Sequence, residues 1–392
     1  MIDLTTSLLA IDVGRGTQDI LVYEPGRPIE NSIKLVLPSP TVVTAAKVRE
    51  ATRAGRPIFL EGFLMGGGAN TGAIREHLAA GLPVYATPKA ALTLHDDPER
   101  VRALGVEIRA TPPGDAAVVR TTDYMEPELR QALSLFGVDY PENVAIAVQD
   151  HGYSPHRSNR IHRFELMREL LDAGDWDLLS LVSDPPLADM TRMQAVLHQA
   201  PGALVTDTGP VALIGALCDP QVRRMARTGV TLVNAGNGHT LCFTLKGREI
   251  HGLFEHHTGA LDPGKLQHYI RRLADGTLTS EEVFDDGGHG AAVRKPLATD
   301  AVVVTGPNRL RLLPEAYQAA PFGDMMLSGC FGLAYLWKKR RAEGPELEKT
   351  RSVFSNSFPY GEVVPRKNSM IWSNSDGEDA DCSPSSPPPS RS

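Results

Sequence analysis

The stretch from Leu8 to Thr17 reads LLAIDVGRGT, and it decides how this sequence folds. Its apolar residues predict a buried strand that runs into a glycine-rich turn, and Ile20–Tyr23 predicts the second strand of a hairpin. The stretch from Val230 to Thr240 reads VTLVNAGNGHT and repeats the pattern, with Thr240–Leu245 as its second strand. At a constant offset of 222 residues, the repeat matches Asp12 to Asn234, Gly14 to Gly236 and Gly16 to Gly238. One glycine-rich turn is weak evidence, but two matching hairpins predict two related halves.

The remaining pattern predicts an α/β fold, because short apolar runs alternate with helical periodicity through residues 1–344. Further predicted strands are Ile58–Glu61, Ala117–Arg120, Val144–Gln149, Ala203–Thr206 and Ala301–Thr305. Predicted helices are Thr41–Ala54, Asn70–Ala80, Glu126–Phe136, Arg163–Ala173, Ala188–Gln199, Pro210–Cys218, Pro263–Ala274 and Leu327–Arg341. We expect an N-terminal lobe over residues 1–205, a C-terminal lobe over 206–344, and a disordered Ser/Pro-rich tail over 345–392.

Composition narrows the classes of function. The 392 residues carry 40 Lys and Arg against 47 Asp and Glu, and the net charge of −7 argues against a dedicated nucleic-acid binder. No stretch approaches the roughly 18 apolar residues of a membrane span, and the N-terminus does not resemble a signal peptide, so we expect a cytoplasmic protein without a membrane partner. The oligomeric state is left open.

The two glycine turns are suited to binding phosphate. Glycine lets backbone N–H groups approach an anion, and the hydroxyls of Thr17 and Thr240 would add donors. Asp12, at the end of its strand, is placed to hold a hydrated Mg²⁺. A pair of ordinary hairpins is the alternative. The sequence contains no P-loop, and Asp19 stands where a Rossmann fingerprint needs its third glycine.

The paired hairpins resemble the two phosphate motifs of the actin-like ATPase superfamily, which includes actin, heat-shock chaperones and sugar kinases. Val302–Asn308 is similar to its adenosine motif and includes Thr305 and Gly306. The resemblance implies a two-lobed, ribonuclease H-like α/β fold that closes over ATP and Mg²⁺. It also implies nucleotide contacts from Gly14, Gly16, Thr17, Asn234, Gly236, Gly238, His239, Thr240, Thr305 and Gly306. The second motif usually opens with Asp, and Asn234 brings no charge to a metal-bound water.

More narrowly, the chain resembles a prokaryotic family filed as putative pyruvate formate-lyase activating enzyme. The shared segments include Met65–Gly68, Gln149–Gly152, Glu255–Thr258, Gly287–Gly290 and Pro321–Met326. Genuine activating enzymes of that name need a Cys-x-x-x-Cys-x-x-Cys motif for an iron–sulfur cluster. The cysteines here are Cys218, Cys242, Cys330 and Cys382, whose spacing cannot supply that motif, so we expect no iron–sulfur cluster and no radical S-adenosylmethionine chemistry.

Five histidines are predicted to lie in loops: His151, His239, His256, His257 and His289. Imidazole serves as a metal ligand or as an acid–base group, so His256, His257 and His289 are candidate ligands of a transition metal. Capping of the loops through the ring nitrogens is the alternative for each. Asp150 follows an apolar run at the carboxyl end of a strand, where α/β folds bind ligands, and with His151 and Asp12 it is a candidate catalytic residue. Gly66–Gly68 precedes a helix and is a candidate anion site for a second substrate.

Three functions therefore compete. The first is an ATP-binding phosphotransferase or ATPase that acts on an unidentified small molecule or partner, with Asp150 as the base. The second is a regulatory switch that binds nucleotide without appreciable turnover, which Asn234 favours. The third is a metal-dependent hydrolase that uses the loop histidines.

Overall fold

The hairpin at Leu8 forms the centre of a five-stranded sheet in the computed structural model, which describes residue 2 and residues 4–343. The strand order is β3-β2-β1-β8-β9, with bounds Leu8–Val13 for β1, Thr17–Tyr23 for β2, Ile33–Pro38 for β3, Val144–Val148 for β8 and Leu204–Thr206 for β9. β1 pairs antiparallel with β2 and parallel with β8, so its carboxyl end and that of β8 meet at one edge. This sheet is the centre of the first lobe.

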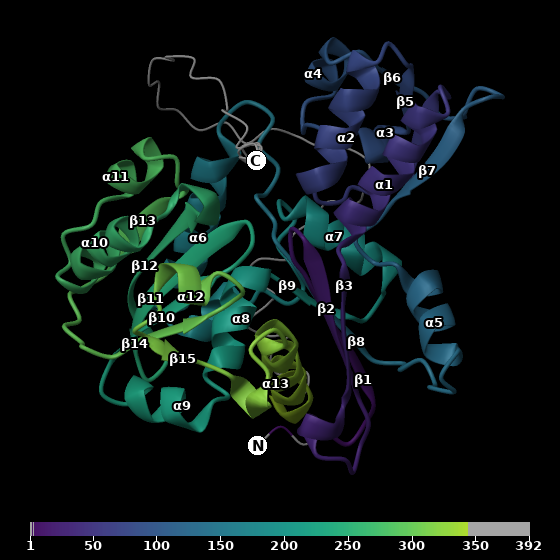
Figure 1. Ribbon diagram of the computed structural model, residues 1–392. Helices are drawn as coiled ribbons and strands as arrows, with labels where there is room; N and C mark the ends of the chain where they lie inside the picture. Colours follow the sequence, from purple (N-terminus) through teal and green to yellow (C-terminus); the bar gives the residue numbers. More distant parts are fainter. Residues whose placement is uncertain (1, 3, 344–392) are drawn as a thin grey trace, which may run out of the picture.

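The second hairpin is the centre of an equivalent sheet in the second lobe (Figure 1). Its order is β13-β12-β11-β10-β14-β15, with bounds Val230–Ala235 for β10, His239–Lys246 for β11, Glu249–His257 for β12, Gly290–Val293 for β13, Val302–Thr305 for β14 and Tyr317–Gln318 for β15. Five strands follow the order of the first lobe, and β13 adds an edge. The predicted α/β architecture of two lobes, each with one glycine-turn hairpin at the centre of its sheet, is confirmed.

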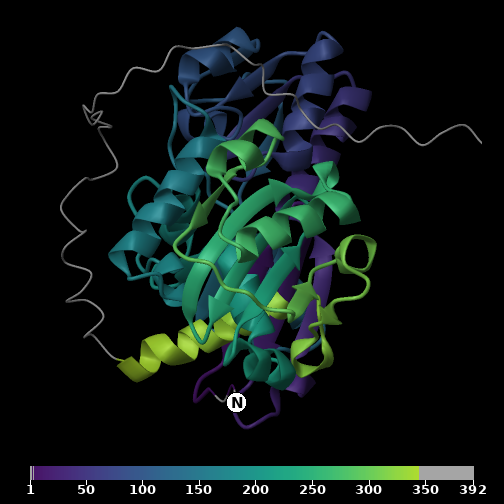
Figure 2. The same cartoon turned by 90° about the vertical axis from the view of Figure 1, so that its left-hand side faces the viewer.

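A separate sheet of four parallel strands is inserted between β3 and β8, in the order β6-β5-β4-β7. The strands are β4 (Ile58–Gly62), β5 (Val84–Ala86), β6 (Val106–Ile108) and β7 (Ala117–Thr121), and the helices among them are α1 (Pro40–Arg53), α2 (Gly68–Ala79), α3 (Pro88–Ala91) and α4 (Pro98–Ala103). Both views place this insertion at one end of the molecule (Figures 1 and 2). It has a hydrophobic core of its own.

Nine further helices cover the sheets. They are α5 (Glu126–Ser134), α6 (Asn159–Ala173), α7 (Thr191–Gln199), α8 (Thr208–Ala216), α9 (Pro220–Ala226), α10 (Pro263–Ala274), α11 (Ser280–Asp285), α12 (Arg309–Leu312) and α13 (Ser328–Glu343) in the described part of the chain. Single 3-10 turns occupy Ile29–Asn31, Leu178–Leu181, Thr258–Ala260 and Pro321–Gly323. None of the helices in residues 2 and 4–343 has the length and apolar character needed to cross a membrane.

Helices α8 and α13 cross between the lobes at two glycines. A Cβ on Gly215 would lie 1.7 Å from the carbonyl oxygen of Ser328, and one on Gly332 would lie 2.1 Å from that of Val211. α13 also packs on β1, although it follows the second lobe in sequence. The backbones therefore touch at the joint between the lobes, and no side chain fits between them.

Replacing Gly215 by alanine is expected to lower the free energy of unfolding by about 3 kcal/mol, because the new methyl group meets backbone that cannot rotate away. Gly72→Ala is the control, since that position lies in helix α2 with nothing within 4 Å of the new Cβ. It should be neutral or stabilising by up to about 1 kcal/mol. Urea denaturation followed by circular dichroism measures both, and equal stability of the two variants would contradict the close crossing.

The predicted lobe boundary stays a prediction, and it falls inside β9, between residues 205 and 206. The predicted tail over 345–392 lies outside the described residues. The predictions did not include β3, β5, β6, β12, β13 or β15. By contrast, the predicted bounds of the strand Leu8–Val13 and the helix Pro263–Ala274 are confirmed.

Candidate functional site

The first glycine turn is a tight link between β1 and β2. The amide of Gly14 donates to the carbonyl of Thr17 across 2.9 Å, and a Cβ on Gly14 would lie only 3.0 Å from that oxygen. Asp12 precedes the turn and is buried, and its carboxylate accepts from the hydroxyl of Thr208 at the start of α8 (2.5 Å). Burial raises the pKa of Asp12 to about 7, despite that hydrogen bond.

Asp19 lies directly opposite Asp12 in the β1–β2 pairing. Its carboxyl is buried, and Oδ1 has no hydrogen-bond partner within the described residues. Burial, followed by the neighbouring charge of Asp12, raises the pKa of Asp19 to about 8. Two buried carboxyls of one sign therefore stand side by side, an arrangement that a bound cation would stabilise.

The second glycine turn repeats the first and touches it. The amide of Gly236 donates to the carbonyl of His239 (3.0 Å), as Gly14 does to Thr17. A Cβ on Gly238 would lie 3.2 Å from Cδ of Arg15, and one on Gly16 would lie 3.6 Å from Nδ2 of Asn237. The turns, one from each lobe, therefore meet tip to tip.

The segment resembling an adenosine motif lies beside the second turn. β14 runs parallel to β10 with Thr305 opposite Asn234, and Gly306 then takes a φ of +93°. A Cβ on Gly306 would lie 2.5 Å from the carbonyl oxygen of Ala235, so glycine is required here. The hydroxyl of Thr305 bonds Ser328 of α13 (2.9 Å), which ties this segment to the joint between the lobes.

Four of the five singled-out histidines converge at the junction of the lobes. His151 follows β8 in the first lobe, whereas His239, His257 and His289 come from β11, β12 and the residue before β13 in the second. Nε2 of His151 and Nε2 of His289 are 3.3 Å apart, and the ring centroids of His239 and His289 are 4.9 Å apart. The ring centroid of His257 lies 4.9 Å from that of His239 and 5.0 Å from that of His289.

Burial keeps these imidazoles neutral. It lowers the pKa of His151 and of His239 to about 3, and lowers the pKa of His289 well below its ordinary value. The pKa of His257 is also lowered, again mainly by burial. Neutral imidazole is the form that binds a metal ion.

The fifth histidine, His256, points to a different place. Its Nε2 lies 3.0 Å from the carboxylate of Asp286, and its ring stacks on Tyr269. The prediction of loops is wrong for three of the histidines, because His239 begins β11 and His256 and His257 end β12. The ladder continues to the pair His239–His257, and successive strand side chains point to opposite faces. His256 and His257 therefore point to opposite faces of the sheet, and only His257 joins the other three histidines.

A buried ionic network supports the histidine cluster. Arg163 of α6 makes two hydrogen bonds to Glu255 (2.7 and 3.0 Å) and two to Asp207 (2.6 and 3.0 Å). Burial alone would raise the pKa of Glu255, but the Arg163 guanidinium holds it well below its ordinary value. Glu255 lies on β12 and Asp207 caps α8 at Gly209, so the network joins the lobes.

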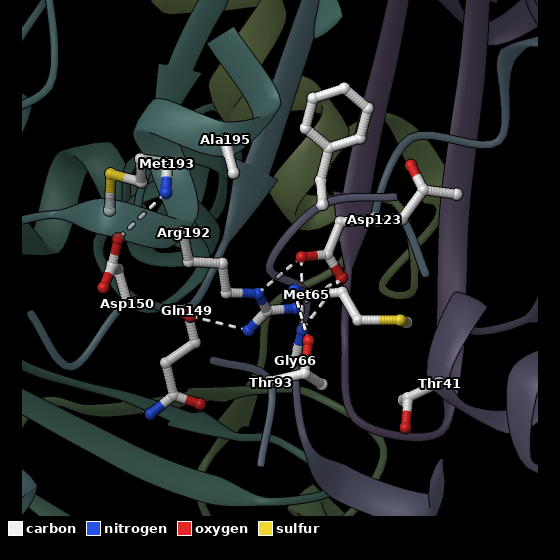
Figure 3. Close-up of polar contacts among 12 residues, drawn as sticks. Thr41, Met65, Gly66, Thr93, Asp123, Gln149, Asp150, Arg192, Met193 and Ala195 are labelled. Carbon is white, nitrogen blue, oxygen red and sulfur yellow. Dashed lines mark hydrogen bonds and ion pairs between the residues drawn. The ribbon is translucent and has the colours of Figure 1, made fainter. Parts of the chain in front are cut away.

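Asp150 has both carboxylate oxygens engaged by backbone amides. Oδ1 accepts from Gly152 (2.8 Å), and Oδ2 accepts from Met193 at the start of α7 (2.9 Å), as Figure 3 shows for the second contact. Burial raises the pKa of Asp150 to about 6, and the two amides oppose that shift. These contacts fix the loop that carries His151. The role of Asp150 as a catalytic base stays a prediction.

The inserted sheet is tied to this region by Arg192 (Figure 3). Arg192 forms two hydrogen bonds to Asp123 (2.7 and 2.8 Å) and donates to the carbonyl of Gln149 (2.6 Å). The amide of Gly66 donates to Asp123 (3.3 Å). The start of the candidate anion site at Gly66–Gly68 is thus bonded to a carboxylate of the protein itself.

The sequence predicted Thr240 as a phosphate donor, and the structure pairs its hydroxyl with another threonine. The hydroxyl of Thr240 is buried against that of Thr258 (3.0 Å), so its role as a phosphate donor stays a prediction. Sequence reasoning missed Arg163, Arg192, Asp123 and the role of Glu255. Only Glu255 had a signal, since it stands directly before the histidine pair at 256 and 257.

Comparison with known proteins gives a family and distant structural neighbours. The profile of the family described as "Putative pyruvate format-lyase activating enzyme (DUF1786)" matches residues 65–311. No curated protein matches the chain. The PPX-GPPA enzyme of Aquifex aeolicus is 13% identical, with a TM-score of 0.28 and coverage of 77% of this chain and 68% of that chain. A Bacteroides thetaiotaomicron protein with an actin-like ATPase fold and unknown function is 9% identical, with a TM-score of 0.32 and coverage of 84% and 98%.

Proposed function

The chain belongs to the family whose profile it matches, and from its own geometry we propose that it binds a magnesium nucleotide at its two glycine turns, as an ATPase or phosphotransferase. The observation that carries the proposal is the meeting of two equivalent turns, one from each lobe, beside the buried carboxyl of Asp12. The activity in the family's description is not proposed, because the cysteine spacing cannot hold its cluster.

Asp12 and Asp19 support a magnesium site. The two buried carboxyls lie opposite each other, and Oδ1 of Asp19, which has no partner among the described residues, leaves negative charge uncompensated when both are ionised. Asp12 would hold the ion through its waters, and Mg²⁺, when bound, would neutralise charge on the phosphates. Thr208 would keep the Asp12 carboxylate oriented toward the start of α8.

The phosphates would lie between Gly14–Gly16 and Gly236–Gly238, where the two glycine turns approach each other. Thr305 and Gly306 would border the nucleoside, because they continue the strand next to β10. Catalysis would then rest on positioning and charge neutralisation, with the lobes excluding water. The second substrate is a small molecule or partner that this arrangement does not identify.

Mg·ATP at 100 times its dissociation constant is expected to raise the melting temperature of wild type by about 5 °C, which follows from about 2.7 kcal/mol of ligand stabilisation. Gly16→Ala should abolish the shift without lowering the melting temperature of the free protein. Its new Cβ would lie at an ordinary 3.6 Å from Asn237, yet it fills the space proposed for phosphate. Asp12→Asn should also lose the shift, and Gly72→Ala should keep it. A wild type that responds to no nucleotide at millimolar concentration would end the proposal.

A regulatory switch is the second candidate, because Asn234 places a neutral amide where the superfamily usually has a carboxylate. Single-turnover release of phosphate from pre-bound ATP separates the two. We expect release in minutes for the enzyme, whereas a pure switch would release almost none while giving the same thermal shift.

A further inference from the structure

We propose that His151, His239 and His289 bind one divalent transition-metal ion, of the zinc or iron(II) class, at the junction of the two lobes. One ring nitrogen from each histidine lies within 4.8 Å of one from each of the others. This site is separate from the proposed magnesium site, since it uses imidazoles and no residue of the Asp12–Asp19 pair.

The spacing of the nitrogens fits two ligands of one metal ion. With metal–nitrogen bonds of about 2.0–2.1 Å, two ligands of a tetrahedral ion lie about 3.3–3.4 Å apart. Nε2 of His151 and Nε2 of His289 are separated by 3.3 Å. Imidazole nitrogen is a preferred ligand for zinc and iron, which selects the class of metal.

The surroundings of His289 are those of an oriented metal ligand. Its Nδ1 lies 4.0 Å from Oε2 of Glu255 and lacks a hydrogen-bond partner among the described residues. Its amide also donates to the carbonyl of Glu255 (2.9 Å). Metal-bound histidines commonly direct their second nitrogen to a carboxylate, and a small rotation of this ring would complete that bond. Arg163 keeps the Glu255 carboxylate fixed through two hydrogen bonds.

His257 lies close to the fourth coordination position of the proposed metal ion, the one that the three ligands leave open. Its ring adjoins those of His239 and His289, and its Nε2 is buried without a partner in the part of the chain that the structure describes. Three imidazole ligands with a further position open are the pattern of catalytic zinc, whereas four would make a closed site. His257 would therefore lie beside the open position. The second glycine turn is next to it, since that turn ends at His239.

A metal ion at this site would link the two lobes, because its ligands come from both of them. His151 is fixed to the first lobe through the loop that Asp150 holds, while His239 and His289 belong to the sheet of the second lobe. A metal ion held by ligands from both lobes would stabilise the arrangement in which the lobes are in contact, because it binds that arrangement only.

The test uses the full-length protein stripped with chelator and titrated with Zn²⁺ or Co²⁺ in the absence of nucleotide. We expect one ion per chain by elemental analysis, a rise in melting temperature, and visible Co²⁺ absorption of a nitrogen-ligated site. His151→Ala and His289→Gln should each weaken binding by at least about 100-fold, which equals or exceeds the loss of an outer-shell partner. His256→Ala is the matched control and should keep the metal, since its ring faces Asp286.

Two outcomes would overturn the proposal. One is a wild type that binds neither metal above trace level, which would leave the four rings as a packed neutral cluster. The other is equal metal binding by wild type and His151→Ala. Because no nucleotide is present, failure here leaves the proposed nucleotide function untouched, and failure of the Mg·ATP experiment leaves the metal site untouched.

Discussion

Arg163→Met is expected to lower the free energy of unfolding by about 3–5 kcal/mol. The substitution leaves Glu255 and Asp207 buried without the guanidinium that pairs with both, and it removes four hydrogen bonds to their carboxylates together with one to the carbonyl of Asp150. The Arg163 side chain is only 3% exposed, so water cannot replace those contacts. Because Asp207 directly follows β9 of the first lobe's sheet and Glu255 lies on β12 of the second lobe's sheet, we also expect weaker contact between the two sheets.

Arg168→Met is the matched control for this prediction. It lies on the same helix, and its ion pair with Asp172 is long (3.7 Å) and exposed. Its loss should change stability by less than about 0.5 kcal/mol. Urea unfolding followed by tryptophan fluorescence compares the variants, and a loss below 1 kcal/mol for Arg163→Met would show that the network is not what holds the lobes together.

Asp19→Asn is expected to stabilise the protein at pH 8 by about 2 kcal/mol or more, and to have little effect at pH 4.5. Burial raises the pKa of Asp19 to about 8 in the folded state, against 3.8 as its ordinary value. Between these pH values the folded state holds a proton that the unfolded state has released, so stability falls as pH rises. Asparagine has no proton that titrates in this range, so the stability of the variant should not fall in this way as pH rises.

Thermal unfolding of wild type and Asp19→Asn at both pH values measures the effect. Glu24→Gln, at an exposed ion pair just after the same strand, is the control and should track wild type at each pH. A difference between wild type and Asp19→Asn that is the same at pH 4.5 and pH 8 would show that the buried carboxyl is ionised throughout this range.

Local pattern predicted both hairpins but missed the shortest strands and the strand richest in polar residues. The segments LLAIDV and VTLVNA carry enough apolar residues to indicate buried strands on their own. β5 and β6 have three residues each, too few for any period to appear. β12 reads EIHGLFEHH, and its polar residues hide a strand that is buried through partners on both sides.

For the candidate site, the sequence could not show which distant residues lie close together in the fold. His151 and His289 are 138 residues apart, and only the fold shows that their side chains meet. Arg163 was predicted at the first position of a helix, where solvent exposure is expected. The helix begins instead at Asn159, which places Arg163 inside it and facing the junction of the lobes.

The contact between the turn tips has a kinetic consequence. Arg15 lies close to Gly238, and Asn237 close to Gly16, so under the proposed function the turn tips would have to separate before a polyphosphate could lie between them. Nucleotide association should then saturate at high ligand concentration, at the rate with which the lobes separate, a motion of the microsecond-to-millisecond class. The rate constant of that opening, rather than diffusion, would set how fast the protein exchanges its nucleotide.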